Sequence, residues 1–336
     1  MKNLLYIGNQ LSQSDKTVTT IDTLSKLLSD EGFSIVTTSG KKNKFLRLLD
    51  MLYQILKHRN WANYILIDTY STQNFYYAYL CSQLCRFFKL KYIPILHGGN
   101  LQNRLKNSQF MSKAIFNNAF KNIAPSEFLK LQFQEYGYGN LEVIPNSIEP
   151  ENYPFKERDF SKPKLLWVRS FSKIYNPLLA INVLKILKDD NIQATLCMVG
   201  PDKDGSLNEA KIYASDCGVD VRFTGKLSKE DWIKISEDFN IFINTTDFDN
   251  MPVSVIEGMA LGLPIISTNV GGLPFLIENE KEGLLIEPND AFLFVEKIKQ
   301  IIENPEMGNN LAANGRIKIE QFDWEIIKNQ WIKLLI

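Results

Sequence analysis

Short apolar segments alternate with helical segments along almost the whole chain, and this alternation constrains the fold more than any other feature. Buried strands rich in Val, Ile and Leu, joined by helices, predict a parallel sheet with helices on both faces. The predicted strands cover residues 4–8, 33–38, 64–70, 92–97, 122–126 and 141–146, then 164–170, 194–200, 221–225, 241–246, 264–268 and 283–287. The gap between the two series predicts two separate sheets.

The stretch from residue 147 to residue 164 separates the two series. It is rich in Pro and charge and has no periodicity, which is typical of a linker. A chain of 336 residues also suits two domains of roughly 150 residues each. We predict one Rossmann-like domain over residues 1–155, a second over 156–320, and a C-terminal helix over 321–336.

Composition places the chain among ordinary globular proteins, with 45% hydrophobic and 23% charged residues. No apolar run approaches the ~18 residues that a membrane-spanning helix needs. The start of the chain lacks the pattern of a signal peptide, because its short apolar stretch leads straight into a predicted strand. These features predict a cytoplasmic protein.

Charge is unevenly distributed, although the chain is neutral overall. Residues 1–150 hold 17 Lys and Arg against 10 Asp and Glu, whereas the remainder holds 21 against 28. The densest basic segment, residues 41–61, has apolar residues at helical spacing. This helix could pack on the sheet as an ordinary amphipathic helix, or its stretch 41–59 could rest on anionic lipid at the inner face of a membrane. The two interpretations are compatible.

Residues 241–288 carry the most informative pattern for function. A strand ends in a polar loop, a helix then opens near Pro252 and carries Glu257, and the next strand leads to a turn at Gly271 and Gly272. Ligands of open parallel sheets bind at the carboxyl ends of the strands. Glycines at such a turn let backbone amides approach phosphate oxygens, and a nearby carboxylate can accept hydrogen bonds from ribose.

This segment resembles the donor-binding signature of retaining glycosyltransferases with the GT-B fold, family 4. The resemblance implies two Rossmann-like domains facing across a cleft, with the acceptor on the first and a nucleoside-diphosphate sugar on the second. It implies that Glu257 binds ribose, that Asp249, in place of the usual Glu, faces the transferred sugar, and that amides near Gly271, Gly272 and Leu273 hold the diphosphate. The segment from Phe322 to Trp331 is similar to the closing helix that crosses back to the first domain.

Other segments match the family in the same order along the chain. Arg169 and then Lys173 follow a strand where the family has a cationic pair that clamps the diphosphate. Gly200 ends the next strand, near the nucleotide. In the first domain the resemblance places His97 near the sugar and Gly8 in the loop over the diphosphate. The likeness covers most of residues 90–336.

The resemblance implies a metal-independent hexose transfer with retention of anomeric configuration. An oxocarbenium-like transition state and a same-face displacement would follow, with the cations and amides stabilising the leaving diphosphate. The sugar donor is a substrate, so no cofactor is expected, and no nucleic acid partner. The Asp247-Phe248-Asp249 segment also fits the metal-binding Asp-x-Asp of the other large transferase fold, an interpretation that the second sheet and the Gly-Gly turn disfavour.

The acceptor implied by the basic helix is a glycan or lipid-linked sugar, as in surface polysaccharide synthesis. Two other functions remain open. One is a nucleotide-sugar epimerase, which can use the same fold, and the other is a non-catalytic module that binds nucleotide sugars.

Overall fold

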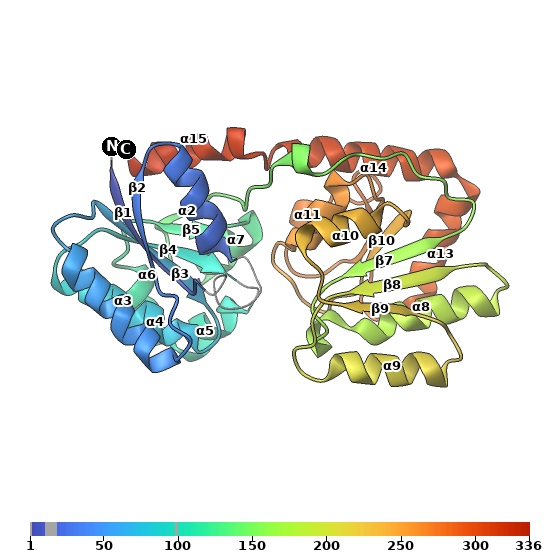
Figure 1. Cartoon of the computed structure of the whole chain (residues 1–336), viewed down its shortest axis with the longest axis horizontal. Coiled ribbons are helices and arrows are strands. Elements are labelled where there is room, and N and C mark those ends of the chain that lie inside the picture. Colours follow the sequence, from blue (N-terminus) through green and yellow to red (C-terminus); the bar gives the residue numbers. More distant parts are fainter. Residues whose placement is uncertain (1, 11–18, 98–99) are drawn as a thin grey trace. The chain divides into compact units, whose positions relative to one another are not determined.

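The computed structural model describes residues 2–10, 19–97 and 100–336 (Figure 1). Its chain divides into two compact units. Unit 1 comprises Met1–Asn146 and Trp324–Ile336, and unit 2 comprises Ser147–Asp323. Each unit contains one six-stranded sheet whose neighbouring strands are all parallel.

Unit 1 has the strand order β2-β1-β3-β4-β5-β6. The central strands are buried along nearly their whole length, because helices cover both faces of the sheet (Figure 1). The elements of unit 1 are β1 (Asn3–Ile7), α2 (Thr20–Asp30), β2 (Ser34–Thr38), α3 (Lys44–His58), β3 (Tyr64–Tyr70), α4 (Asn74–Phe87), β4 (Tyr92–His97), α5 (Leu101–Asn107), α6 (Gln109–Phe116), β5 (Asn122–Ala124), α7 (Glu127–Glu135), β6 (Leu141–Val143) and α15 (Trp324–Leu335).

Unit 2 has the strand order β12-β11-β10-β7-β8-β9. Its elements are the 3-10 turn η1 (Pro150–Asn152), β7 (Lys164–Val168), the 3-10 turn η2 (Lys173–Tyr175), α8 (Pro177–Asp189), β8 (Thr195–Val199), α9 (Ser206–Asp216), β9 (Arg222–Gly225), α10 (Lys229–Ser236), β10 (Ile241–Asn244), α11 (Val253–Ala260), β11 (Ile265–Thr268), α12 (Leu273–Leu276), β12 (Leu284–Ile286), α13 (Ala291–Glu303) and α14 (Pro305–Glu320). The prediction of two parallel α/β sheets is confirmed.

The last helix, α15, belongs to unit 1 although it follows unit 2 in the chain. In Figure 1 this red helix lies beside the blue helix α2. Trp324, Ile327 and Trp331 are buried against the core that also holds Leu4 and Ile93. The predicted return of the C-terminal helix to the first domain is confirmed.

The segment predicted as a linker is packed against unit 2 instead. The side chains of Tyr153 and Phe160 are buried, and the buried guanidinium of Arg158 donates hydrogen bonds to backbone carbonyls, among them that of Leu261. Burial lowers the pKa of Arg158 to about 10. Unit 2 therefore begins at Ser147, whereas the sequence analysis divides the domains after residue 155.

The basic helix α3 uses only part of its apolar surface for packing. Met51 and Ile55 are fully buried, whereas Phe45, Leu49 and Leu56 are exposed. The expectation that this stripe packs on the sheet is therefore only partly correct. Among the described residues, no helix has both the length and the apolar character needed to cross a bilayer.

Candidate functional site

Arg169 and Asp249 form an ion pair at the carboxyl edge of the unit 2 sheet. Arg169 directly follows β7, and Asp249 lies in the loop between β10 and α11. The guanidinium Nη2 donates to the Asp249 carboxylate, and both side chains are mostly buried. β7 and β10 are neighbours in the sheet, so residues 80 positions apart meet at one point.

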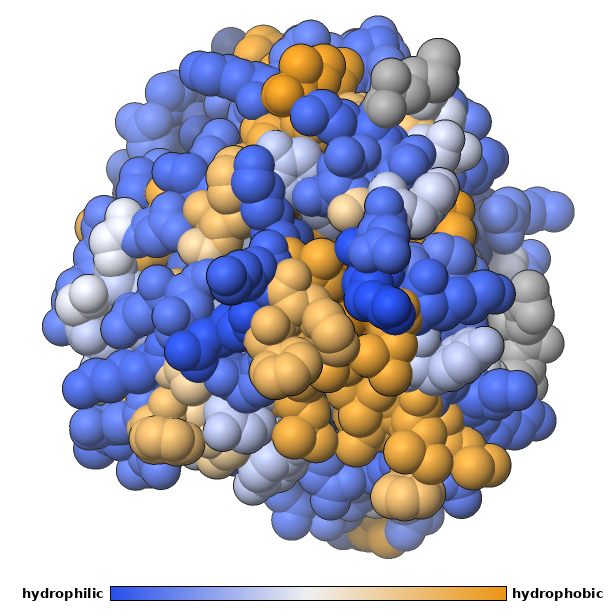
Figure 2. Space-filling view, turned by 90° about the vertical axis from the view of Figure 1, so that its left-hand side faces the viewer, coloured by the Kyte–Doolittle hydropathy of each residue, from blue (hydrophilic) through white to orange (hydrophobic). Residues whose placement is uncertain are grey.

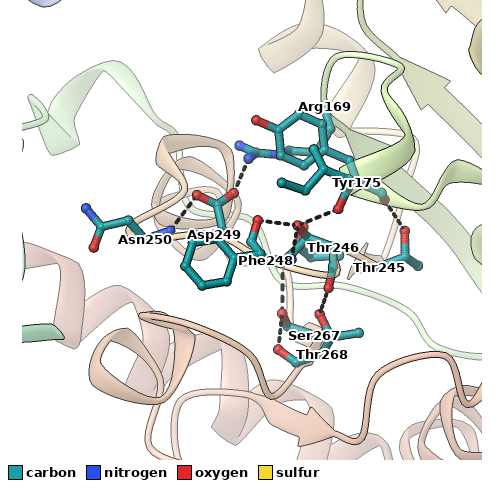
Figure 3. Close-up of polar contacts among 11 residues, drawn as sticks. Arg169, Tyr175, Thr245, Thr246, Phe248, Asp249, Asn250, Ser267 and Thr268 are labelled. Carbon is teal, nitrogen blue, oxygen red and sulfur yellow. Dashed lines mark hydrogen bonds and ion pairs between the residues drawn. The ribbon is translucent and has the colours of Figure 1, made fainter. Parts of the chain in front are cut away.

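Tyr175 fixes the other side of Arg169. The guanidinium carbon lies 4.0 Å from the centre of the tyrosine ring, a cation–π contact. Threonine hydroxyl groups join the segments at the carboxyl ends of β7, β10 and β11 (Figure 3). Thr245 donates to the carbonyl of Tyr175 at 2.9 Å, and Thr268 donates to the carbonyl of Thr246 at 2.6 Å. The cation is therefore held in position by packing and hydrogen bonds from three strand ends.

Glu257, on α11, is buried and held by two partners. The hydroxyl of Tyr153 donates to its Oε1 at 2.7 Å, and the ammonium of Lys229 lies 3.0 Å from the same atom. Burial and the charge of Glu257 raise the pKa of Tyr153, so this hydroxyl stays a donor. Arg316 donates to the carbonyls of Pro150 and Tyr153, which holds the tyrosine segment in place. A buried carboxylate with one oxygen committed can still accept hydrogen bonds through the other.

Lys173 lies in a different environment from the one expected for a partner of Arg169. Its side chain is exposed, and its ammonium lies 3.8 Å from Glu209 on α9. Its backbone amide donates to Asp204 at 3.1 Å, which orients the turn η2. Within the described part of the chain, the cation that contacts Glu257 is Lys229, a residue that the sequence analysis did not select.

The turn at Gly271 and Gly272 packs tightly against the loop that carries Asp249. A Cβ atom on Gly271 would overlap the carbonyl oxygen of Asp249, and one on Gly272 would overlap that of Asn250. Gly271 has a φ of +57°, which also favours glycine. The backbone amide of Gly272 donates to the backbone carbonyl of Asp249 at 2.9 Å. The backbone amide of Leu273 donates to the backbone carbonyl of Val270 at 3.1 Å. These two amides are thus already used within the protein, and α12, which follows, has only 4 residues.

Gly200 plays a similar part at the end of β8. Its φ is +151°, and a Cβ atom there would overlap the carbonyl oxygen of Arg169. The glycine therefore lets the strand end lie directly against the backbone of Arg169. This close approach is a structural reason for glycine at a position that the sequence analysis assigns to donor binding.

Unit 1 has a cluster of polar side chains toward the carboxyl ends of β1, β3 and β4. His97, the last residue of β4, lies with Nε2 2.7 Å from Oδ1 of Asp68 on β3. The same oxygen accepts a hydrogen bond of 2.9 Å from the hydroxyl of Tyr6. The imidazole also stacks on Tyr70, with ring centroids 4.7 Å apart. Gly98 and Gly99, which follow His97 in the sequence, lie outside the described residues.

Asp68 is fully buried, and its Oδ2 has no hydrogen-bond partner in the described part of unit 1. A Cβ atom on Gly8 would overlap this oxygen, so glycine after β1 leaves room for the carboxylate in its present position. Burial, with the charge of Asp68 second, raises the pKa values of Tyr6 and Tyr70. The structure thus brings His97 and Gly8 together through a carboxylate that the sequence analysis missed.

The acidic residues of the Asp-x-Asp segment point to different partners. Asp249 pairs with Arg169, whereas Asp247 accepts a hydrogen bond of 3.2 Å from the amide of Asn176. In the described ranges, no group of three or more His, Cys, Asp or Glu side chains is arranged to hold a metal ion.

Solved structures with the same architecture cover nearly the whole chain. Sucrose-phosphate synthase from Thermosynechococcus elongatus superimposes with a TM-score of 0.81 over 99% of this chain and 98% of that one, at 17% identity. HepE from Anabaena, solved with UDP-glucose, gives a TM-score of 0.78 over 100% and 99% of the two chains, at 16% identity. The fold is therefore GT-B.

Curated relatives match at modest identity. An uncharacterized glycosyltransferase of Methanocaldococcus jannaschii is 24% identical over 324 residues, 91% of this chain and 90% of that protein. The UDP-Gal:alpha-D-GlcNAc-diphosphoundecaprenol alpha-1,3-galactosyltransferase of Escherichia coli is 27% identical over 194 residues, 53% of this chain and 49% of that protein. The match to the second relative thus spans about half of its length.

The family model described as glycosyl transferases group 1 matches residues 150–318, which include Arg169, Lys229, Asp249 and Glu257. This match covers half of the chain and nearly all of unit 2. The chain belongs to the glycosyl transferases group 1 family.

Proposed function

We propose that the protein is a retaining glycosyltransferase of family 4. It transfers a hexose from a nucleoside-diphosphate sugar to a glycan or lipid-linked acceptor in surface polysaccharide synthesis, without a metal ion or cofactor. The observation that carries this proposal is a pair of fixed groups in unit 2: the guanidinium of Arg169 at the carboxyl edge of the sheet, and the carboxylate of Glu257 on α11, the helix that follows the neighbouring strand β10. Such an edge is where open parallel sheets bind nucleotides.

The two groups suit the two ends of a nucleoside diphosphate. The carboxylate of Glu257 accepts hydrogen bonds from ribose hydroxyls, while Lys229 and Tyr153 keep it oriented. Arg169 binds the diphosphate, for which a planar guanidinium is well matched. Because Asp249 already occupies Arg169, the incoming diphosphate competes with that carboxylate, and Asp249 is then available to accept hydrogen bonds from the transferred sugar.

Cleavage of the glycosidic bond develops negative charge on the leaving diphosphate. A prearranged guanidinium stabilises this charge without reorganisation. Retention then proceeds by same-face displacement, in which a donor phosphate oxygen accepts the proton of the acceptor hydroxyl. We further propose a role in the reaction for His97 of unit 1, whose imidazole Asp68 orients.

A lipid-linked acceptor is supported by the names of two relatives. The E. coli galactosyltransferase acts on a diphosphoundecaprenol-linked sugar, as its name states. An alpha-1,3-N-acetylgalactosaminyltransferase of Campylobacter jejuni, whose name also specifies a diphospho-undecaprenol acceptor, is 26% identical over 171 residues, 51% of this chain and 42% of that protein. We extend this acceptor class to the present chain.

Purified protein incubated with radiolabelled nucleotide sugars tests the proposal. With a polyprenyl-diphosphate-linked sugar present, label should move into the lipid fraction with its anomeric configuration kept. With donor alone, only slow hydrolysis is expected. Conversion of the donor sugar without acceptor would identify an epimerase, and tight donor binding without turnover would identify a binding module.

A further inference from the structure

Helices α3 and α4 pack against each other at the surface of unit 1 and expose a broad set of large apolar side chains. On α3 the exposed residues are Phe45, Leu46, Leu49, Tyr53 and Leu56. On α4 they are Tyr76, Leu80 and Phe87. Their spacing places them on one side of each helix. Figure 2 shows a continuous hydrophobic area on this side of the molecule, bordered by hydrophilic residues. We name these eight residues the α3–α4 face.

Several side chains of the α3–α4 face are more than half exposed. Phe45 is 67% exposed, Tyr53 57% and Phe87 79%. In proteins generally, large contiguous exposed apolar patches mark surfaces that contact a protein or a membrane. The opposite side of α3 supplies Met51 and Ile55 to the core. The exposed apolar side of the helix is therefore not needed for packing within unit 1.

Basic residues predominate around the α3–α4 face. Between Lys41 and Lys121 the sequence contains 13 Lys and Arg but only two acidic residues, Asp50 and Asp68. Asp68 is buried, and Asp50 accepts a hydrogen bond of 3.0 Å from Thr38. Exposed basic residues adjoin both helices: Lys41, Lys42, Lys44, Lys57, Arg59 and Arg86.

The protein fixes this arrangement at the start of α3. The buried guanidinium of Arg47 donates to the carbonyls of Lys41 at 2.8 Å and Lys42 at 3.0 Å, which orders the backbone of the basic loop. The side chain of Asn43 caps the helix by accepting from the amides of Phe45 and Leu46 at 2.9 and 3.1 Å. The lysines and the first exposed apolar residues are therefore presented together.

From this surface we infer that the α3–α4 face binds an anionic lipid bilayer, with its apolar side chains among the acyl chains and its lysines at the headgroups. Apolar insertion and attraction to anionic lipid combine in this way at membrane interfaces. A second copy of the chain fits less well, because its own α3–α4 face carries the same positive charge. The inference stands on this surface alone and does not require the proposed catalytic activity.

Vesicle co-sedimentation of the full chain tests the inference. The protein should pellet with phosphatidylcholine vesicles containing about 30% phosphatidylglycerol, and much less with phosphatidylcholine alone. Lys41→Glu/Lys42→Glu should weaken partitioning about tenfold or more. Phe45→Ser/Leu49→Ser should weaken it by a similar factor. Raising KCl from about 0.1 M to about 1 M should release most of the protein.

Matched substitutions at exposed positions of unit 2 serve as controls: Lys188→Glu/Lys211→Glu for charge and Ile212→Ser/Phe292→Ser for apolar contact. These variants should pellet like the original protein. The inference would be overturned if the unit 2 controls lost vesicle binding as much as the α3–α4 variants, or if the unsubstituted protein did not pellet with anionic vesicles. So would a dimer in analytical ultracentrifugation that Phe45→Ser/Leu49→Ser converts to monomer. Nucleotide binding by every variant is measured in parallel, so failure here is separate from failure of the proposed function.

Discussion

The hydroxyl of Tyr153 donates a 2.7 Å hydrogen bond to Oε1 of Glu257, although the two residues are 104 positions apart in the chain. This contact joins the segment that enters unit 2 to the helix α11. It orients the buried carboxylate of Glu257. The proposed binding of a nucleoside diphosphate to unit 2 depends on this orientation.

Tyr153→Phe should therefore weaken binding of the nucleoside diphosphate without unfolding the protein. Loss of a hydrogen bond to a charged group costs about 1.5–3 kcal/mol, so the dissociation constant should rise by about tenfold or more. Isothermal titration calorimetry measures the change. Tyr136→Phe, at an exposed position of unit 1, is the matched control and should bind as the original protein does.

Lys229 should matter more to donor binding than Lys173, because Lys229 contacts Glu257 whereas Lys173 is exposed beside Glu209. We expect Lys229→Ala to raise the dissociation constant at least about fivefold and Lys173→Ala to change it less than twofold. The same calorimetric titration compares the two. A larger effect at Lys173 would restore the cationic pair that the sequence analysis predicts.

Gly272→Ala should destabilise unit 2, because a Cβ atom at this position would overlap the carbonyl oxygen of Asn250. Overpacking of this kind costs about 2 kcal/mol of unfolding free energy. Urea denaturation followed by circular dichroism measures it. Gly139→Ala is the control, since no atom lies within 4 Å of the added Cβ. If Gly272→Ala left the free energy of unfolding unchanged, the turn at Gly272 would not pack against the loop of Asp249 and Asn250 as described.

Asp204 should make stability depend on pH at the acid end. Hydrogen bonds from the side chains of Ser206 and Ser172 and from the amide of Lys173 lower its pKa from 3.8 to about 2. A lowered pKa in the folded state means that its contribution is present above about pH 4 and is lost as the pH falls toward 2. Asp204→Asn should flatten the pH dependence of unfolding in this window. A titration by NMR that returned an ordinary pKa for Asp204 would contradict the assignment.

Asp68→Asn should lower kcat by about tenfold or more with little change in KM, because Asp68 positions His97 rather than contacting the donor. The substitution keeps the size of the buried side chain, so circular dichroism should remain unchanged. An equal rise in KM with unchanged kcat would mean that this pair serves binding instead.

The strands were predictable because most of them are short apolar runs between turn residues, and all twelve predicted strands form. Arg169, Asp249 and Glu257 were predictable as candidates because the segments that carry them resemble the donor-binding signature of the family, and Arg169 and Asp249 also lie in the loops that follow β7 and β10. The other residues that contact Arg169 and Glu257 were not predictable. Tyr153 and Tyr175 reach the site from turns and Lys229 from the start of α10, and no local pattern in the sequence marks these three residues.

Two further features required coordinates. The turn η2 directs Lys173 toward α9, which spacing along the chain does not reveal. Asp68 is a charged residue within a largely apolar strand, which marks it as unusual in the sequence, but its contact with His97 is visible only in the structure.

We propose that unit 2 binds a nucleoside diphosphate through Arg169 and Glu257. A thermal-shift screen of nucleoside diphosphates tests this binding, because a ligand that binds the folded state raises the melting temperature. At least one nucleotide should raise Tm of the original protein, and the shift should disappear in Arg169→Ala and in Glu257→Ala while both variants stay folded. Equal shifts in all three proteins, or no shift with any nucleotide, would contradict the claim.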